Sequence, residues 1–152
     1  MKKIANKMTI GLLVVVCVSL FSFTKLPGGD SFQVYLNGKL VLDKALYGKK
    51  SIQNLELLQA SSNDKVEIYY SHCGHTGTSR SLTAKNEQQK ILKTWKFPDA
   101  NGSKMSLRLQ ELRDLQANNK SETISLYYSS KELPSGQELA SVSVNNKSIA
   151  AK

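Results

Sequence analysis

Cysteine, proline and histidine are all scarce in this chain of 152 residues, which has two Cys, three Pro and two His. The low cysteine count excludes a disulfide scaffold, and the composition excludes a collagen-like or low-complexity chain. Cys17 lies in an apolar amino-terminal run, so a chain cleaved after that run keeps Cys73 alone and cannot close an internal disulfide. Stability must then come from an apolar core, and the chain is long enough to bury one as a single domain.

Acidic residues are also few, with 12 Asp and Glu against 21 Lys and Arg and a formal net charge of +9. Three of the lysines lie in the first 24 residues, so 18 basic side chains face 12 acidic ones in the remainder. Those basic residues are dispersed, and the longest run is the pair Lys49-Lys50. Nucleic-acid-binding proteins concentrate Lys and Arg on one face or element. The pattern therefore predicts a solvated surface and no nucleic-acid partner.

Several signatures of catalysis and of membrane transport are missing. The chain has no Gly-x-Gly-x-x-Gly, P-loop, Gly-x-Ser-x-Gly or His-Glu-x-x-His motif. It has a single long apolar run, which excludes a polytopic membrane protein. On these grounds we predict a protein that is not an enzyme and that has no cofactor.

The amino terminus has the layout of a secretory signal peptide. Lys2, Lys3 and Lys7 precede an apolar run from Met8 to Phe23, which is shorter than the roughly 20 residues that a membrane-spanning helix needs. We predict a signal peptide over 1–24 and export to the periplasm or the exterior, with an uncleaved membrane anchor as the alternative. The remaining predicted segments are a linker over 25–30, a domain over 31–145 and a tail over 146–152.

Beyond the linker, short apolar runs of period two alternate with turn residues. Asn37-Gly38 lies between two such runs, and this dipeptide is a strong signal for a hairpin with a type I′ turn. The pattern predicts an all-β, antiparallel β-sandwich, immunoglobulin-like or jelly-roll-like. Leucines at helical spacing from Leu109 to Leu115 indicate one short helix at an end of the sandwich, or a strand that bends into a helical turn.

The predicted core contains the inward residues of these runs, with Trp95 as its largest contributor. Its members are Phe32, Val34, Leu36, Leu40, Leu42, Val66, Ile68, Trp95, Leu107, Ile124, Leu126 and Val142.

Two strands share an apolar-Tyr-Tyr-Ser sequence, which places one ring inward and one outward on each strand. The outward rings, Tyr69 and Tyr127, are candidates for one exposed aromatic patch. Together with Arg80 they are the predicted binding residues.

The loop after the first Tyr-Tyr pair concentrates the reactive side chains of the chain. His72, Cys73 and His75 carry imidazole and thiolate donors that suit zinc or copper. A tetrahedral site would need a carboxylate such as Asp64 or Glu67 as its fourth ligand. Two other readings compete with a metal site: Cys73 as a nucleophile with a histidine base, or Cys73 as a small buried hydrophobe in a tight glycine-containing connection. The structural reading is the preferred one.

The chain resembles small signal-peptide-bearing exported proteins of Bacteroidetes-type bacteria. The stretches that carry the resemblance are FSFTKLPGGDSFQVYLNGKLVL, YYSHCGHTGTSR and LYYSSKELPSGQELASVSV. The resemblance implies export and a β-rich domain, and it supplies no catalytic residues. The sequence therefore predicts a non-catalytic exported β-sandwich that binds an envelope protein or a glycan. A metal- or thiol-dependent protein centred on the His72 loop is the alternative.

Overall fold

The computed structural model describes residues 29–46, 52–57, 60–61, 63–99 and 102–144. The predicted signal peptide with Cys17, and the tail over 146–152, lie outside these residues. None of the helices within the described ranges is both long enough and apolar enough to span a bilayer.

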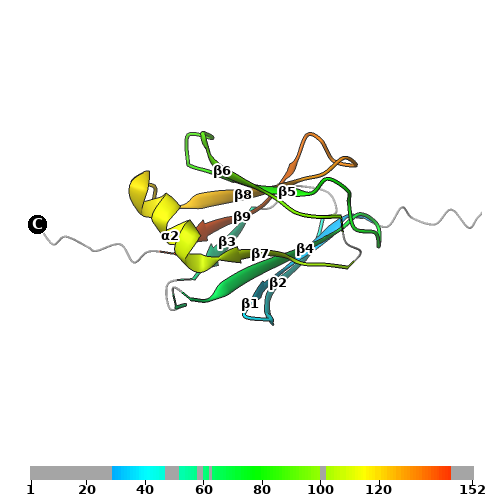
Figure 1. Ribbon diagram of the computed structural model, residues 1–152, viewed down its shortest axis with the longest axis horizontal. Helices are drawn as coiled ribbons and strands as arrows, with labels where there is room; N and C mark the ends of the chain where they lie inside the picture. Colours follow the sequence, from blue (N-terminus) through cyan, green and yellow to red (C-terminus); the bar gives the residue numbers. More distant parts are fainter. Residues whose placement is uncertain (1–28, 47–51, 58–59, 62, 100–101, 145–152) are drawn as a thin grey trace, which may run out of the picture.

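Two stacked sheets form the molecule, which confirms the predicted all-β sandwich (Figure 1). One sheet has four strands in the order β2-β1-β4-β7, and the other has five in the order β3-β9-β8-β5-β6. The strands are β1 (Ser31–Leu36), β2 (Lys39–Ala45), β3 (Gln53–Glu56), β4 (Lys65–Ser71), β5 (Ser81–Lys85), β6 (Ile91–Lys96), β7 (Met105–Arg108), β8 (Ile124–Ser129) and β9 (Gln137–Ser143).

Most neighbouring strands pair antiparallel, and the exception is β3. This short strand lies parallel to β9, with Leu55 opposite Val142. The sequence left its segment open between a strand and a helical turn, and a four-residue edge strand has little pattern of its own. Parallel pairing at one edge is compatible with the sandwich, because the chain crosses from one sheet to the other before β3.

The predicted hairpin between β1 and β2 is confirmed, and its turn uses Asn37 and Gly38 at φ 51° and 79°. Positive φ at both central residues is what a type I′ turn requires. Within the hairpin the register shifts after Val34, so that Leu42 pairs with Val34 and Leu40 pairs with Tyr35. This irregularity sets which leucine faces the core.

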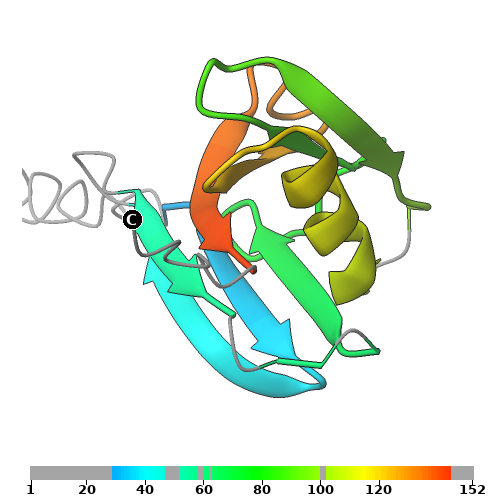
Figure 2. The ribbon, with the colours of Figure 1, turned by 90° about the vertical axis from the view of Figure 1, so that its left-hand side faces the viewer.

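The predicted helix is also present, as α2 (Leu109–Asn118), and it follows β7 without an intervening loop. Its buried residues include Leu109 and Leu112, which lie three apart on one face. Figure 1 and Figure 2 show α2 across one end of the sandwich beside β7. Both sequence interpretations therefore describe part of the segment, since a strand runs directly into a helix that covers the end of the core.

The core between the sheets matches most of the predicted list. Phe32, Val34, Val66, Ile68, Leu107, Ile124, Leu126 and Val142 are all buried. The largest fully buried side chains are Tyr70 and Tyr128, which the sequence placed inward without ranking them.

Two core predictions are wrong. Leu40 is 45% exposed, because the register shift in the hairpin aligns it with the outward Tyr35. Trp95 is half-buried and is not the largest contributor, because β6 is an edge strand and the indole lies at its margin.

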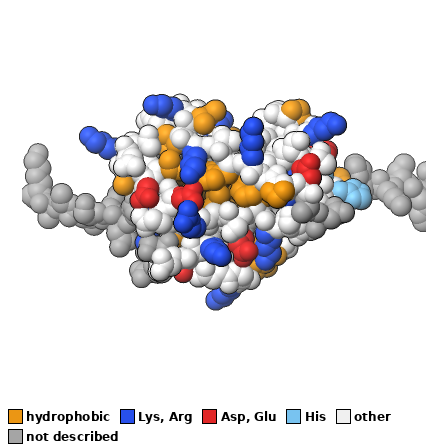
Figure 3. Space-filling model, viewed as in Figure 1, with side chains coloured by type: hydrophobic (Ala, Val, Ile, Leu, Met, Phe, Trp, Pro, Cys, Tyr) orange, Lys and Arg blue, Asp and Glu red, His pale blue; other side chains and the backbone are white. Residues whose placement is uncertain are grey.

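Figure 3 shows hydrophobic side chains in a band across the middle of the face seen in Figure 1, with charged side chains on both sides.

Candidate functional site

The predicted reactive loop begins with a tight turn directly after β4. The backbone N–H of His72 donates to the carbonyl of His75 at 2.6 Å, and the His75 N–H returns a bond to His72 at 3.0 Å. Cys73 and Gly74 occupy the centre of this turn at φ 50° and 93°. Cys73 is exposed, so the interpretation of it as a buried hydrophobe is wrong. A residue at the tip of a two-residue turn lies beyond the last strand pair and has no core to enter.

The ring of His72 points into the molecule and uses both nitrogens. Nδ1 lies 3.2 Å from Oδ2 of Asp30, and Nε2 lies 3.0 Å from the Tyr128 hydroxyl and 3.2 Å from Oγ of Ser130. A carboxylate only accepts, so a neutral ring carries its proton on Nδ1 and accepts at Nε2. The hydroxyl of Tyr70 donates to the same Asp30 oxygen at 2.8 Å.

Tyr70 and Tyr128 bring the two sheets together beneath this network. Their rings stack with centroids 4.0 Å apart and planes 11° apart. Burial raises the pKa of both hydroxyls above the ordinary value, and the Asp30 carboxylate raises that of Tyr70 further. Both tyrosines therefore stay neutral and keep a proton to donate in any ordinary buffer.

Asp30, His72 and Ser130 have the order of contacts found in a Ser-His-Asp triad. Ser130 is nevertheless buried, and its Oγ also accepts the backbone N–H of Leu133 at 3.2 Å. The backbone of Gly77 covers the same spot, since a Cβ built there would meet the Tyr128 hydroxyl at 2.4 Å and Ser130 Oγ at 2.8 Å. A substrate carbonyl has no room at this serine, so the contacts favour a network that joins the two sheets.

The three predicted metal ligands are not brought together. His72 is bonded inward, whereas Cys73 and His75 are exposed in the turn. Across the part of the chain that the structure describes, no group of three His, Cys, Asp or Glu side chains could hold a metal ion. The Cys73 sulfur is 4.0 Å from Asp30 Oδ1. Of the two carboxylates that the sequence suggested as a fourth ligand, Asp64 accepts from Asn37 Nδ2 at 2.8 Å and Glu67 lies on the outer face of β4 opposite Tyr35.

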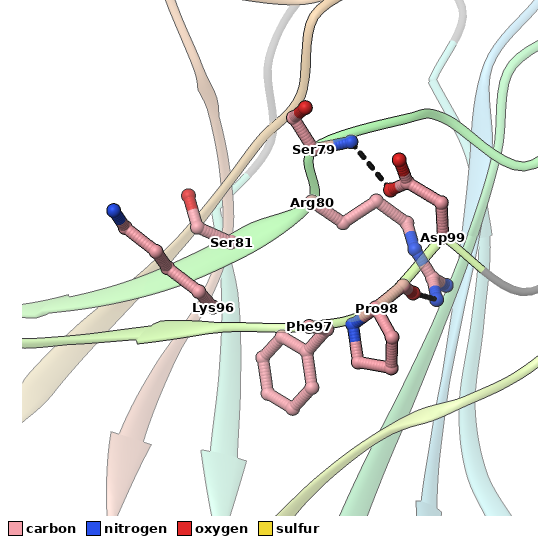
Figure 4. Close-up of a pocket in the computed structure, with 7 residues that line it drawn as sticks. All are labelled: Ser79, Arg80, Ser81, Lys96, Phe97, Pro98 and Asp99. Atoms are coloured by element: carbon pink, nitrogen blue, oxygen red, sulfur yellow. Dashed lines mark hydrogen bonds between the residues drawn. The ribbon is translucent and has the colours of Figure 1, made fainter.

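Arg80, a predicted binding residue, is almost fully buried at 2% exposure. Its guanidinium donates to the carbonyls of Ser103 and Pro98 at 2.8 and 2.6 Å and to Ser103 Oγ at 2.7 Å. Arg80 thus holds the segment between β6 and β7 in place. It also lines a pocket, which Figure 4 shows from the side of Phe97 and Pro98.

Tyr69 and Tyr127 both point outward, as predicted, but they cannot form one patch. Tyr69 belongs to the four-stranded sheet and Tyr127 to the five-stranded sheet. Their inward neighbours stack on each other between the sheets, so the two outward rings lie on opposite outer faces of the sandwich.

Tyr69 has an aromatic neighbour that the sequence reasoning missed. On the same face Tyr69 pairs with Gln33 and Tyr35 pairs with Glu67, which makes the two tyrosines diagonal neighbours on adjacent strands. We call the outward residues Gln33, Tyr35, Leu40, Asp43, Glu67 and Tyr69 the tyrosine face. Once the β1–β4 pairing is known, the alternation along β1 places Tyr35 there.

Asp30 and Ser130 were also missed, because the sequence assigned Asp30 to a linker and gave Ser130 no role. Asp30 immediately precedes β1, and Ser31 pairs with Ser71. Extending that register by one residue sets Asp30 beside His72. Identifying Asp30 would therefore have required the pairing of two residues that are 42 positions apart, and local sequence patterns do not contain that information.

Comparison of this chain with protein-family models, with curated proteins and with solved structures finds no match. Function is therefore argued from the geometry alone.

Proposed function

We propose that this protein is an exported, non-catalytic binding protein that takes an extracellular glycan on its tyrosine face. The observation that carries the proposal is the outward ring of Tyr69, which has Tyr35 as its diagonal neighbour on the adjacent strand. Aromatic rings offer an apolar surface on which the C–H face of a sugar ring stacks, and their hydroxyls bond at the edge.

The polar side chains around the two rings suit a polyhydroxylated ligand. Gln33 donates to Asp43 at 3.0 Å and accepts from the Tyr35 hydroxyl at 2.7 Å, so a chain of amide, carboxylate and hydroxyl groups crosses the face. Glu67 lies opposite Tyr35 on β4. Carboxylates accept the hydroxyl protons that sugars carry in quantity.

The charge on this face favours a glycan over a protein partner. Protein interfaces are depleted of acidic residues at their centre, whereas Asp43 and Glu67 flank the rings here. Exposed apolar area is small, with Leu40 at 45% and Val41 at 39% as the exposed large hydrophobics of this sheet. Export remains an expectation from the basic and apolar amino terminus.

The opposite face offers a matched control. Tyr127 has the same place in the same local sequence, but its hydroxyl lies 2.9 Å from both Gln89 and Glu138 and Lys85 covers its ring at 3.9 Å. By contrast, no hydrogen bond to the Tyr69 hydroxyl joins it to another described residue. Tyr35 resembles Tyr127 in this respect, because Lys104 lies over its ring at 3.4 Å and its hydroxyl bonds Gln33. Tyr69 is therefore the ring of this face that a sugar can contact without displacing a lysine or a hydrogen bond between described residues.

The test is retention of the purified protein on insoluble cellulose, chitin, xylan and peptidoglycan. At least one polymer should retain the protein, and Tyr69→Ala should weaken that binding about tenfold while Tyr127→Ala leaves it unchanged. Failure of all four polymers to retain the protein would contradict the proposal. Equal losses in the two variants would contradict it as well.

A further inference from the structure

The edge strand β6 has backbone groups that face away from its partner β5. The N–H of Phe97 donates to the carbonyl of Arg80 at 2.9 Å, which fixes which residues of β6 bond to β5. In an antiparallel ladder, hydrogen-bonded residues alternate with residues whose N–H and C=O point to the other side. Thr94 and Lys96 are the alternate residues here, so both direct their backbone groups to the free edge.

The side chains of β6 give this edge two different sides. Trp95 pairs with the buried Leu82 and, like Phe97, is half-buried against the core. Lys96 points away from Phe97, to the outer face of the sheet, as Figure 4 shows. A strand added beside β6 continues the same alternation, so its inner side chains lie beside the aromatic rings and its outer ones lie beside Lys96.

The charge of β6 is of one sign. Residues 90–97 contain Lys90, Lys93 and Lys96 and no acidic side chain. Lys93 bonds Glu111 at 2.7 Å, whereas Lys90 and Lys96 are exposed and form no ion pair with another described residue. Lysines on an edge strand oppose pairing with a neutral or basic strand, which includes β6 of a second copy. The same charge favours a strand that carries acidic side chains.

The other edge strands are less suited to accept a partner. β3 and β7 have four residues each, and β7 runs directly into α2. The register shift in the β1–β2 hairpin interrupts β2, and such an irregularity turns an edge away from further pairing. The β5–β6 pairing, in contrast, is regular from Lys93 to Lys96.

We infer that β6 binds an extended segment of a partner protein in which acidic and apolar side chains alternate. The segment pairs with the backbone of Thr94 and Lys96 and adds a sixth strand to the sheet. Its apolar side chains cover Trp95 and Phe97, and its acidic side chains lie beside Lys96. The tyrosine face belongs to the other sheet, so this site is independent of the proposed glycan site.

The test titrates isotope-labelled protein with two blocked synthetic peptides, one repeating Glu-Val and the other repeating Lys-Val, and follows the amide signals. We expect saturable chemical shift changes over 93–97 with the acidic peptide and none with the basic one. The amides of Thr94 and Lys96 should also exchange more slowly with solvent when the acidic peptide is bound, because the peptide carbonyls accept them.

Thr94→Pro is the most informative variant, because proline removes an N–H that faces the free edge and leaves the bonds to β5 in place. It should weaken binding of the acidic peptide about tenfold. Lys96→Glu places like charges side by side and should weaken the same binding about fivefold. Lys39→Glu is the matched control, since Lys39 is an exposed lysine on the edge strand β2, and it should leave binding unchanged.

The inference is overturned if the acidic peptide gives no saturable shifts, if the basic peptide binds equally well, or if Thr94→Pro binds like the wild type. Sedimentation of the protein without peptide tests the competing occupant. A dimer that Thr94→Pro dissociates would assign this edge to a second copy and would overturn the inference as well. Tyr69→Ala should leave the peptide titration unchanged, so its outcome is separate from that of the glycan test.

Discussion

The two Tyr-Tyr pairs of this molecule present the same local sequence to two different environments. Tyr70 and Tyr128 are 2% and 0% exposed and stack between the sheets, while Tyr69 and Tyr127 lie on the outer faces. Each inner hydroxyl joins the network around His72, with Tyr70 on Asp30 and Tyr128 on Nε2. The outer rings are both half-buried but differ in their contacts, because polar neighbours hold the Tyr127 hydroxyl, whereas no hydrogen bond joins the Tyr69 hydroxyl to another described residue. Position across the sheet decides whether a tyrosine stabilises the fold, and the local neighbours decide whether it can bind.

The largest expected effect comes from removing an inner ring. Tyr128→Ala should lower the free energy of unfolding by about 3–5 kcal/mol, because it leaves a cavity and removes one of the two hydroxyl partners of His72 Nε2. Tyr127→Ala should cost less than about 1 kcal/mol. Urea unfolding of both variants checks this difference. Similar losses for the two would break the distinction between inner and outer rings.

A smaller loss is expected where the inner hydroxyl is crowded. Gly77→Ala should destabilise the protein by about 1–3 kcal/mol, because the added Cβ would lie 2.4 Å from the Tyr128 hydroxyl. In a Tyr128→Phe background that hydroxyl is gone, so the same glycine substitution should cost less. The measurement is a double-mutant cycle by urea unfolding. An unchanged cost in the second background would show that the hydroxyl is not what the new methyl group meets.

The smallest effect concerns Glu111, which accepts the hydrogen bond that holds Trp95 at the margin of the core. The Trp95 Nε1 donates to Glu111 at 2.9 Å, and Lys93 bonds the same carboxylate oxygen at 2.7 Å. Lys93, then Trp95, lower the pKa of Glu111 from 4.5 to about 2. A lowered pKa in the folded state means that the ionised Glu111 stabilises the fold above pH 4.5, and that this contribution is lost as the pH falls toward 2.

Glu111→Gln should therefore cost about 1 kcal/mol at pH 7, a value reduced for partial solvent screening, and close to nothing near pH 2. Urea unfolding of wild type and variant at pH 7, 4 and 2.5 measures the difference. Glu56→Gln, at an exposed glutamate on β3, is a charge control that should not reproduce this pH dependence. A cost for Glu111→Gln that stays constant over the three pH values would contradict the assignment.

Much of the fold could be predicted from local patterns, and the hairpin and helix show why. Asn37-Gly38 specifies a turn because few residues tolerate its φ angles, and leucines three apart specify a helical face. Leu40 was wrongly predicted to be buried, because one irregular step in the β1–β2 register turns it outward. A slip of one residue reverses the facing of a side chain, and the sequence carries no clear mark of where such a slip occurs.

The candidate sites also have some features that the sequence determines and others that depend on the tertiary structure. The sequence by itself determined that β4 and β8 each turn one tyrosine inward and one outward, because alternation is a property of every strand. Only the tertiary structure decided that Asp30, His72 and Ser130 meet, that Arg80 is buried beside a pocket, and that Tyr35 joins Tyr69 on one face. Each of these contacts spans two strands or two sheets, and such pairings depend on register and sheet order, which are fixed only when the whole core is assembled.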